Sequence, residues 1–342
     1  MVRAFIAVIL SLACGTLPGR AAGAPARAFV QPAADAPATP PPAVGGLAPG
    51  LEAVWAGGET RRYRFTQSVS EKTGSAATPE QFVERRGTMR LEVSITAFTT
   101  SPTPPTTPED VNPEVGTLAP GETAWRMTID VLRLTAALPS GGEVVFDSAD
   151  PELCKPDNRF AVSAGPLVGA SVVFITDMTG KVTRATGHDD LLDITSPAAR
   201  LAVQMIESTS IGAKFGPVMG WPQSGSQAVG TEWQHDRSVP YVPGIVLEVA
   251  NACRVEAADG AIVTVASKGT PRLRIPNPAR LGTREIAASD IHSTTQWDAA
   301  KGALRKHEAF LSTDVLLKGA NAGEESVGLV RNKVESVLEA IE

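Results

Sequence analysis

Residues that carry nucleophilic, metal or nucleotide chemistry are scarce in this chain. Its 342 residues include three cysteines and four histidines, and aromatic side chains make up 5% of the total. No two histidines have the four-residue spacing of a helical zinc site, and no two cysteines have the Cys-x-x-Cys spacing of a structural zinc site. Neither a Walker A pattern nor a Gly-x-Gly-x-x-Gly loop after a strand is present. We therefore expect no cofactor.

The chain also lacks a basic stripe. It holds 31 Lys and Arg against 37 Asp and Glu, which gives a formal net charge of -6. Nucleic-acid binding needs clustered Lys and Arg to neutralise phosphates, so no nucleic-acid partner is predicted. The acidic excess is spread along the chain, which favours solubility and identifies no partner.

A long apolar run is missing as well. The first residues read MVRAFIAVILSLACGTLPGRAAG, with Arg3 before an apolar or small run at 4–13. This pattern predicts a secretory signal peptide over 1–21 and export to the periplasm or the extracellular space. The run is shorter than the ~20 residues that span a bilayer, so the mature protein is not expected to be transmembrane. The segment ending at Cys14 resembles a bacterial lipobox, although Ser11 replaces its leucine, so a lipid anchor at Cys14 stays an alternative.

Two cysteines remain beyond the predicted signal peptide, Cys154 and Cys253. In an exported chain two cysteines favour one disulfide, and the alternative is two separate buried thiols.

Three regions differ in composition. Residues 22–50 are rich in alanine, proline and glycine, which predicts a disordered tether because few apolar residues are available to offset the entropy of ordering. Residues 51–342 form one predicted β-rich domain. Within it, the Pro- and Thr-rich stretch 99–122 lies between two strand-like segments and is interpreted as a long exposed loop.

Strict alternation of apolar and polar residues dominates the predicted domain. It is clearest at 89–97, and segments around 62–69 and 125–131 follow the same period of two, which predicts half-buried antiparallel strands. Turn residues at Asp177–Gly180, Asp259-Gly260 and Asp298–Gly302 predict hairpins.

Helical signals are few. Ser196-Pro197 and the apolar spacing after it predict a helix over about 197–209, which resumes before Trp221. Residues 327–341 fit either a helix or a strand, and we favour a strand that closes the sheet at an edge. The predicted fold class is mainly β (α+β), a single curled antiparallel sheet or half-barrel with one or two covering helices.

The stretch GSQAVGTEWQHDR, 225–237, holds the densest group of reactive side chains. On a strand, Trp233 and His235 share one face and Asp236 the other, so His235 and Asp236 diverge instead of forming a catalytic dyad. The loop sequence His188-Asp189-Asp190 is interpreted as a solvated turn, with a cation site or a contribution to a hydrolase as the alternatives. We predict no catalytic, cofactor or metal residue.

Several short motifs resemble a group of secreted bacterial proteins of unknown function. The matching positions are Phe146-Asp147-Ser148, Asp177 with Gly180-Lys181-Val182, and Val229-Gly230 with Trp233. The resemblance covers roughly residues 58–320 and brings no catalytic role with it. The expected architecture is also similar to that of the LolA-like lipoprotein carriers, in which a curled antiparallel sheet and a helical lid enclose an apolar cavity.

A curled sheet that is too wide to fill leaves an apolar cavity, which is the usual kind of ligand site. The candidate cavity residues are Tyr63, Phe65, Met127, Ile129, Phe174 and Trp233. The expected function is an exported, non-enzymatic protein that binds a lipid or other apolar ligand. The alternatives are a hydrolase or metal-dependent enzyme with a loop-borne site, and a structural component of the cell envelope.

Overall fold

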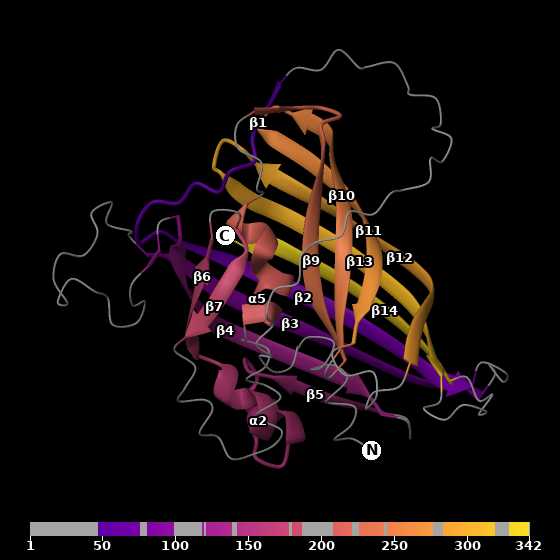
Figure 1. Ribbon diagram of the computed structural model, residues 1–342. Helices are drawn as coiled ribbons and strands as arrows, with labels where there is room; N and C mark the ends of the chain where they lie inside the picture. Colours follow the sequence, from indigo (N-terminus) through magenta and orange to yellow (C-terminus); the bar gives the residue numbers. More distant parts are fainter. Residues whose placement is uncertain are drawn as a thin grey trace.

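A computed structural model describes most of the region beyond residue 46. The described residues are 47–75, 81–98, 118–119, 121–138, 142–177, 180–186, 208–220, 226–242, 245–275, 283–318 and 328–341. They form one open antiparallel sheet of twelve strands, a separate two-stranded ribbon and two short α-helices (Figure 1). This confirms the predicted fold class.

The strands of the large sheet are β2 (Thr60–Ser75), β3 (Val83–Ala97), β4 (Thr123–Ala137), β5 (Glu143–Asp147), β6 (Ser171–Thr176), β7 (Val182–Thr186), β9 (Glu232–Val242), β10 (Ile245–Asp259), β11 (Ile262–Arg274), β12 (Thr283–Asp298), β13 (Ala303–Lys318) and β14 (Gly328–Ile341). The ribbon pairs β1 (Leu47–Gly50) with β8 (Ser226–Ala228). The α-helices are α2 (Arg159–Ala164) and α5 (Ser208–Phe215), and the 3-10 helices are η3 (Pro151–Cys154), η4 (Gly165–Leu167) and η6 (Gly216–Met219).

The order of strands across the sheet is β7-β6-β4-β3-β2-β14-β13-β12-β11-β10-β9, with β5 also paired to β4. Strands β9 to β13 form a meander in which each strand pairs with its neighbour in sequence. The predicted C-terminal strand is confirmed, but its predicted place at an edge is wrong. Strand β14 lies inside the sheet, between β13 and β2, and joins the meander to the N-terminal strands.

Alternating burial explains why these segments are strands. In β3 the side chains of Met89, Leu91, Val93 and Ile95 are at most 3% exposed and all point to one face, which we call the inner face. Side chains between them point to the other, outer face, where Arg90 forms an ion pair with Glu92. One half-buried face is what a period of two predicts.

A glycine at the middle of β11 makes room for the side chains of its two neighbouring strands. Gly269 pairs with Asn251 of β10 and lies between strands β10 and β12. A Cβ at this position would lie 2.6 Å from Val249 Cγ1 and 2.8 Å from Ile291 Cγ2. Side chains of the two flanking strands thus fill the space that a side chain at position 269 would need, a close approach that a glycine inside a strand permits.

We expect Gly269→Ala to lower the free energy of unfolding by about 1–3 kcal/mol, the usual cost of overpacking a core. Urea unfolding would measure the loss. Gly165→Ala is the matched control, because a Cβ at Gly165 meets nothing within 4 Å. The double variant Gly269→Ala with Val249→Ala should recover part of the loss, and an unchanged stability in Gly269→Ala would contradict the close packing at this position.

Helix α5 covers the gap between the two edges of the sheet, which we call the seam. It contacts β9 on one side and β7 on the other, and Figure 1 shows it between these two strands. Its buried residues Ile211 and Phe215 belong to the main apolar core. The start of the helix predicted for 197–209 lies outside the described residues, and α5 with η6 occupies the predicted continuation before Trp221.

The second α-helix was not predicted. The side chain of Asn158 caps α2 by accepting a hydrogen bond from Phe160 N at 3.0 Å. The helix has six residues, too few to show an apolar period in the sequence. It contacts β5, away from the seam.

The predicted signal peptide at 1–21 lies outside the described residues, as do most of the tether at 22–50 and most of the loop at 99–122. The last four tether residues, Leu47–Gly50, form strand β1. Among the described residues, no helix has both the length and the apolar character needed to span a membrane.

Candidate functional site

The inner face of the sheet carries two apolar clusters. The first cluster contains the buried residues of β2, β3 and β4 together with α5, η6 and parts of β9 to β13. The second cluster is made of Ile245, Leu247, Val249, Ile291, Leu311 and Val315. Val334 of β14 and Val239 of β9 pack against the second cluster as half-buried side chains.

A row of small or polar side chains separates the two clusters on neighbouring strands. It consists of Gln67, Ser336, Ala309, Ser293 and Ser267, which are paired one to the next across β2, β14, β13, β12 and β11. The Oγ atoms of Ser267 and Ser293 lie 2.7 Å apart and hydrogen bond to each other. This row, which we call the polar row, keeps the inner face from being apolar throughout.

A small cavity of about 60 Å³ opens where α5, β9 and the polar row meet, and we call it the inner pocket. Its lining residues are Phe65, Gln67, Ala213, Lys214, Arg237, Val239, Ala309, Phe310, Leu311, Val334 and Ser336. Most of these side chains are apolar, and two are cationic. The pocket therefore joins an apolar wall to a positive charge beneath the seam.

Arg237 is the unusual member of this lining. Its Nε is enclosed and has no hydrogen-bond partner among the described residues. No described carboxylate lies within ion-pair distance of its guanidinium, and burial lowers its pKa. The second cation, Lys214, is buried at the end of α5, where its Nζ donates to Ser210 Oγ.

Two histidines near Arg237 do not change this charge at neutral pH. Burial, and then the charge of Arg237, lowers the pKa of His307 to about 3, and its Nδ1 hydrogen bonds to Thr295 Oγ1 at 2.8 Å. The same two causes lower the pKa of His235 on β9, against a small opposing effect of Asp236. Both rings are neutral at pH 7, so the pocket keeps its positive charge.

The predicted divergence of side chains in 225–237 is confirmed. Trp233 is buried on the inner face and His235 is partly buried there, while Asp236 is exposed on the outer face. His235 and Asp236 therefore form no dyad. Continuing the same alternation by two residues places Arg237 on the inner face, and this signal was overlooked in the sequence.

The six candidate cavity residues come together, but as a packed core. Tyr63, Phe65, Met127, Ile129, Phe174 and Trp233 all belong to the first cluster, and none is more than 9% exposed. The ring of Phe65 lies 5.9 Å from that of Phe215 on α5, and Trp125 stacks on Phe174 at 6.4 Å. Of the six, only Phe65 also lines the inner pocket.

The predicted disulfide between Cys154 and Cys253 does not form, and both cysteines are free. Cys154 is exposed in η3, where its Sγ contacts Asp147 O at 3.3 Å. Cys253 is buried on the inner face of β10, and burial raises its pKa to about 11. One thiol faces solvent and the other faces the core. The two thiols are therefore separate, as in the alternative to a disulfide, but only Cys253 is buried.

The loop candidates His188, Asp189 and Asp190 lie outside the described residues. Within the ranges that the structure describes, no three His, Cys, Asp or Glu side chains are grouped as metal ligands.

The short motifs behind the family resemblance have structural roles. Phe146 is buried in β5, and Ser148 Oγ accepts a hydrogen bond from Leu132 N at 3.0 Å. Asp177 Oδ1 accepts from Lys181 N at 3.1 Å, in a turn where Gly180 has a φ of 75°. These contacts explain the motifs as turn and strand-end features.

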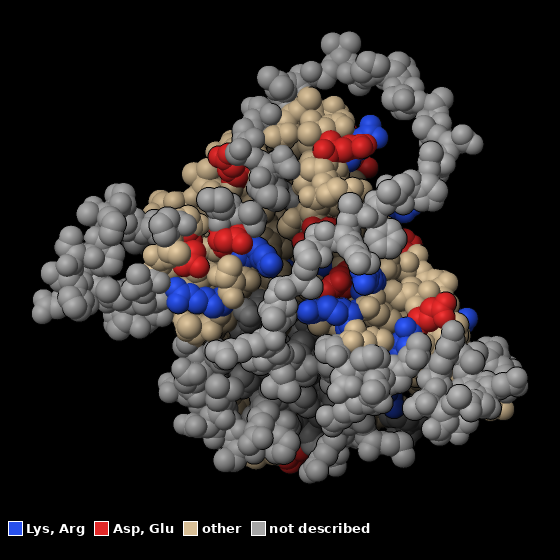
Figure 2. All heavy atoms as spheres, viewed as in Figure 1, with Lys and Arg blue, Asp and Glu red and all other residues tan. Residues whose placement is uncertain are grey.

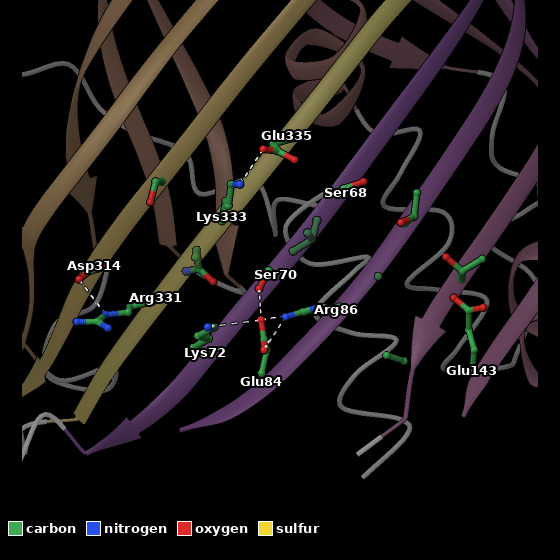
Figure 3. A pocket seen from close by; sticks show the side chains of 17 residues that line it. Ser68, Ser70, Lys72, Glu84, Arg86, Glu143, Asp314, Arg331, Lys333 and Glu335 are labelled. Atoms are coloured by element: carbon green, nitrogen blue, oxygen red, sulfur yellow. Dashed lines mark hydrogen bonds and ion pairs between the residues drawn. The ribbon is translucent and has the colours of Figure 1, made fainter. Parts of the chain in front are cut away.

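A larger trough of about 700 Å³ lies mainly on the outer face of β2, β3, β13 and β14 (Figure 3). Apart from Glu143, its charged side chains are paired with each other. Glu84 lies 2.9 Å from Arg86 and 3.7 Å from Lys72, and the pairs Arg331–Asp314 and Lys333–Glu335 span 3.1 and 2.8 Å. Exposed pairs of this kind describe a solvated face rather than a site that needs a ligand.

The visible surface has no continuous area of one charge. Figure 2 shows Lys and Arg interspersed with Asp and Glu over the described residues on the side that carries α5. This is the arrangement expected from the spread of charges in the sequence.

No protein-family model and no curated protein matches this chain. Among solved structures, it is similar to lipovitellin, in a structure that concerns lipid–protein interactions, with 9% identity over 82% of this chain and a TM-score of 0.40. The chain spans 25% of that protein's length.

Two further solved structures are similar at a lower level. One is DynF from the dynemicin biosynthesis pathway of Micromonospora chersina, with 7% identity, coverage of 86% of this chain and 87% of that chain, and a TM-score of 0.21. The other is Pseudomonas aeruginosa OpdL, with 10% identity, coverage of 83% of this chain and 99% of that chain, and a TM-score of 0.17. These similarities assign no family to the chain.

Proposed function

We propose that the protein binds a lipid or other apolar small molecule on the inner face of its sheet and catalyses no reaction. The observation that carries this proposal is the inner pocket, a partly enclosed cavity with apolar walls at the one place where the sheet does not close. Apolar cavities with a few converging polar groups are the usual form of a small-molecule site.

Size sets a condition on binding. Pockets for drug-sized ligands measure about 300–1,000 Å³, several times the roughly 60 Å³ of the inner pocket. A lipid therefore fits only after part of the cover moves. Helix α5 is the suitable part, because eight residues are too few for a helix that is stable without its packing contacts.

The side chains around the pocket favour binding over catalysis. His235 and His307 have lowered pKa values and are poor proton acceptors at pH 7. Cys253, with its raised pKa, is a protonated thiol and a weak nucleophile. The proposal includes export to the cell envelope, with or without a lipid anchor at Cys14. Its only support is the signal-peptide pattern at the N-terminus.

A disulfide across the seam tests the proposal. A Cβ at Gly212 of α5 would lie 3.6 Å from Val182 Cβ of β7, which is within the range that a disulfide bridges. We expect the oxidised double variant Gly212→Cys, Val182→Cys to bind the neutral apolar dye Nile red at least tenfold more slowly than the reduced form. Stopped-flow fluorescence of delipidated protein would measure the rate.

The reduced double variant is the matched control and should bind at the rate of the parent chain. Equal rates in the oxidised and reduced forms would show that α5 is not the entrance. A complete lack of saturable Nile red binding by the parent chain would overturn the proposed function itself.

A further inference from the structure

Arg237 has no counter-charge among the residues that the structure describes. It projects from the edge strand β9 into the inner pocket, where Val239, Leu311 and Val334 supply apolar surface. Its Nε is enclosed without a hydrogen-bond partner in the described part of the chain. Arg237 is half-buried as a whole, and an enclosed donor of a charged group is costly unless it is hydrogen bonded.

None of the described neighbours supplies the missing negative charge. The titratable side chains that interact with Arg237 are His235 on its own strand, Cys253 on β10 and His307 on β13, and all three are uncharged at pH 7. Lys214 on α5 lines the same pocket, where its Nζ donates to Ser210 Oγ, so it is no source of negative charge either. The local field therefore favours an anion in the pocket.

A second polar group points to the same place. Gln67 belongs to the polar row and lines the pocket, and its Oε1 is buried without a partner among the residues described. An amide can donate or accept a hydrogen bond, so Gln67 is suited to a headgroup oxygen or hydroxyl beside Arg237. Unpaired donor and acceptor atoms in one apolar cavity are the features of a headgroup site.

We propose that the ligand is an anionic amphiphile whose headgroup pairs with Arg237, with Gln67 beside it. This inference rests on the proposed function and adds the chemical class of the ligand. The alkyl chain lies against the second apolar cluster, which begins at the pocket with Leu311 and Val334. The headgroup supplies the charge-assisted hydrogen bonds that Arg237 does not make within the described chain.

Two amphiphiles of equal chain length test the charge preference. Hexadecyl phosphate, below its critical micelle concentration, and hexadecan-1-ol, below its solubility limit, are used to displace Nile red from the delipidated full chain. We expect hexadecyl phosphate to bind at least tenfold more tightly than hexadecan-1-ol. In Arg237→Met the ratio of the two dissociation constants, that of hexadecan-1-ol over that of hexadecyl phosphate, should fall at least tenfold.

The control is Arg254→Gln, which removes an arginine whose side chain is 55% exposed near Glu232 on the outer face. The ratio should stay at the value of the parent chain in this variant. Arg237→Met should also unfold at an equal or higher urea midpoint without ligand, because an uncompensated charge has been removed.

The outcomes separate the two proposals. If hexadecan-1-ol and hexadecyl phosphate both fail to displace Nile red, the proposed function fails. If both bind equally well, or if the ratio survives in Arg237→Met, the protein binds apolar molecules and the headgroup site is wrong. A lower unfolding midpoint in Arg237→Met would assign Arg237 a structural role and would also overturn the headgroup site.

Discussion

Deletion of residues 328–342 is expected to abolish cooperative folding. These residues form β14, which pairs along its length with β13 on one side and with β2 on the other. Its removal exposes two long strand edges and the partners of Leu338, which is 1% exposed. Domains of this size are stable by about 5–15 kcal/mol, and the loss of a central strand exceeds that margin.

The test compares the truncated chain with the same chain co-expressed with a fragment covering residues 324–342. Circular dichroism and urea unfolding should show a cooperative transition only when the fragment is present. The fragment is the matched control, because it restores the strand without restoring the covalent connection. A truncated chain that unfolds cooperatively at an unchanged urea midpoint would contradict the central position of β14.

Acid is expected to destabilise the protein through His307. The pKa of this ring is about 3 in the folded state, against an ordinary value of 6.5. The unfolded chain therefore binds the proton first, and the free energy of unfolding falls as the pH drops below about 6.5. Each unit of pH within that window costs about 1.4 kcal/mol, so about 3 kcal/mol is lost between pH 7 and pH 4.5.

The variant His307→Gln isolates this effect. Its amide can retain the hydrogen bond to Thr295 and cannot take up the proton. Burial raises the pKa of Glu71, which acts in the opposite direction, but Glu71 is present in both proteins and cancels in the comparison. We expect the stabilities of parent and variant to converge as the pH falls, and parallel curves would show that His307 is not the source.

Sequence patterning predicts the strands well, because each strand has one face against the core and one in water. The period of two at 89–97 becomes β3, and the Asp259-Gly260 turn joins β10 to β11 with Gly260 at a φ of 57°. The pairing of β14 is not visible in such a pattern. An amphipathic strand looks the same at an edge and in the middle, and only the unpaired sides of β2 and β13 decide its place.

The candidate site was only partly predictable, for a related reason. The alternation that places Trp233 and His235 inward also places Arg237 inward, so its face could be read from the sequence. Its surroundings could not, because they depend on how distant strands pair and on α5 contacting both β7 and β9. The predicted disulfide failed similarly, since the spacing of Cys154 and Cys253 carries no information about their distance in space.

The central position of β14 also governs the order of events during folding. Strands β2 to β7 and the meander β9 to β13 are both synthesised before β14, and neither half can pair with the other until β14 is available. Contacts between segments so distant in sequence close slowly, because the loop entropy is lost before the pairing is gained. Until then the free edges of β2 and β13 are exposed templates for intermolecular pairing, so the unfinished chain is more prone to aggregate than the finished one.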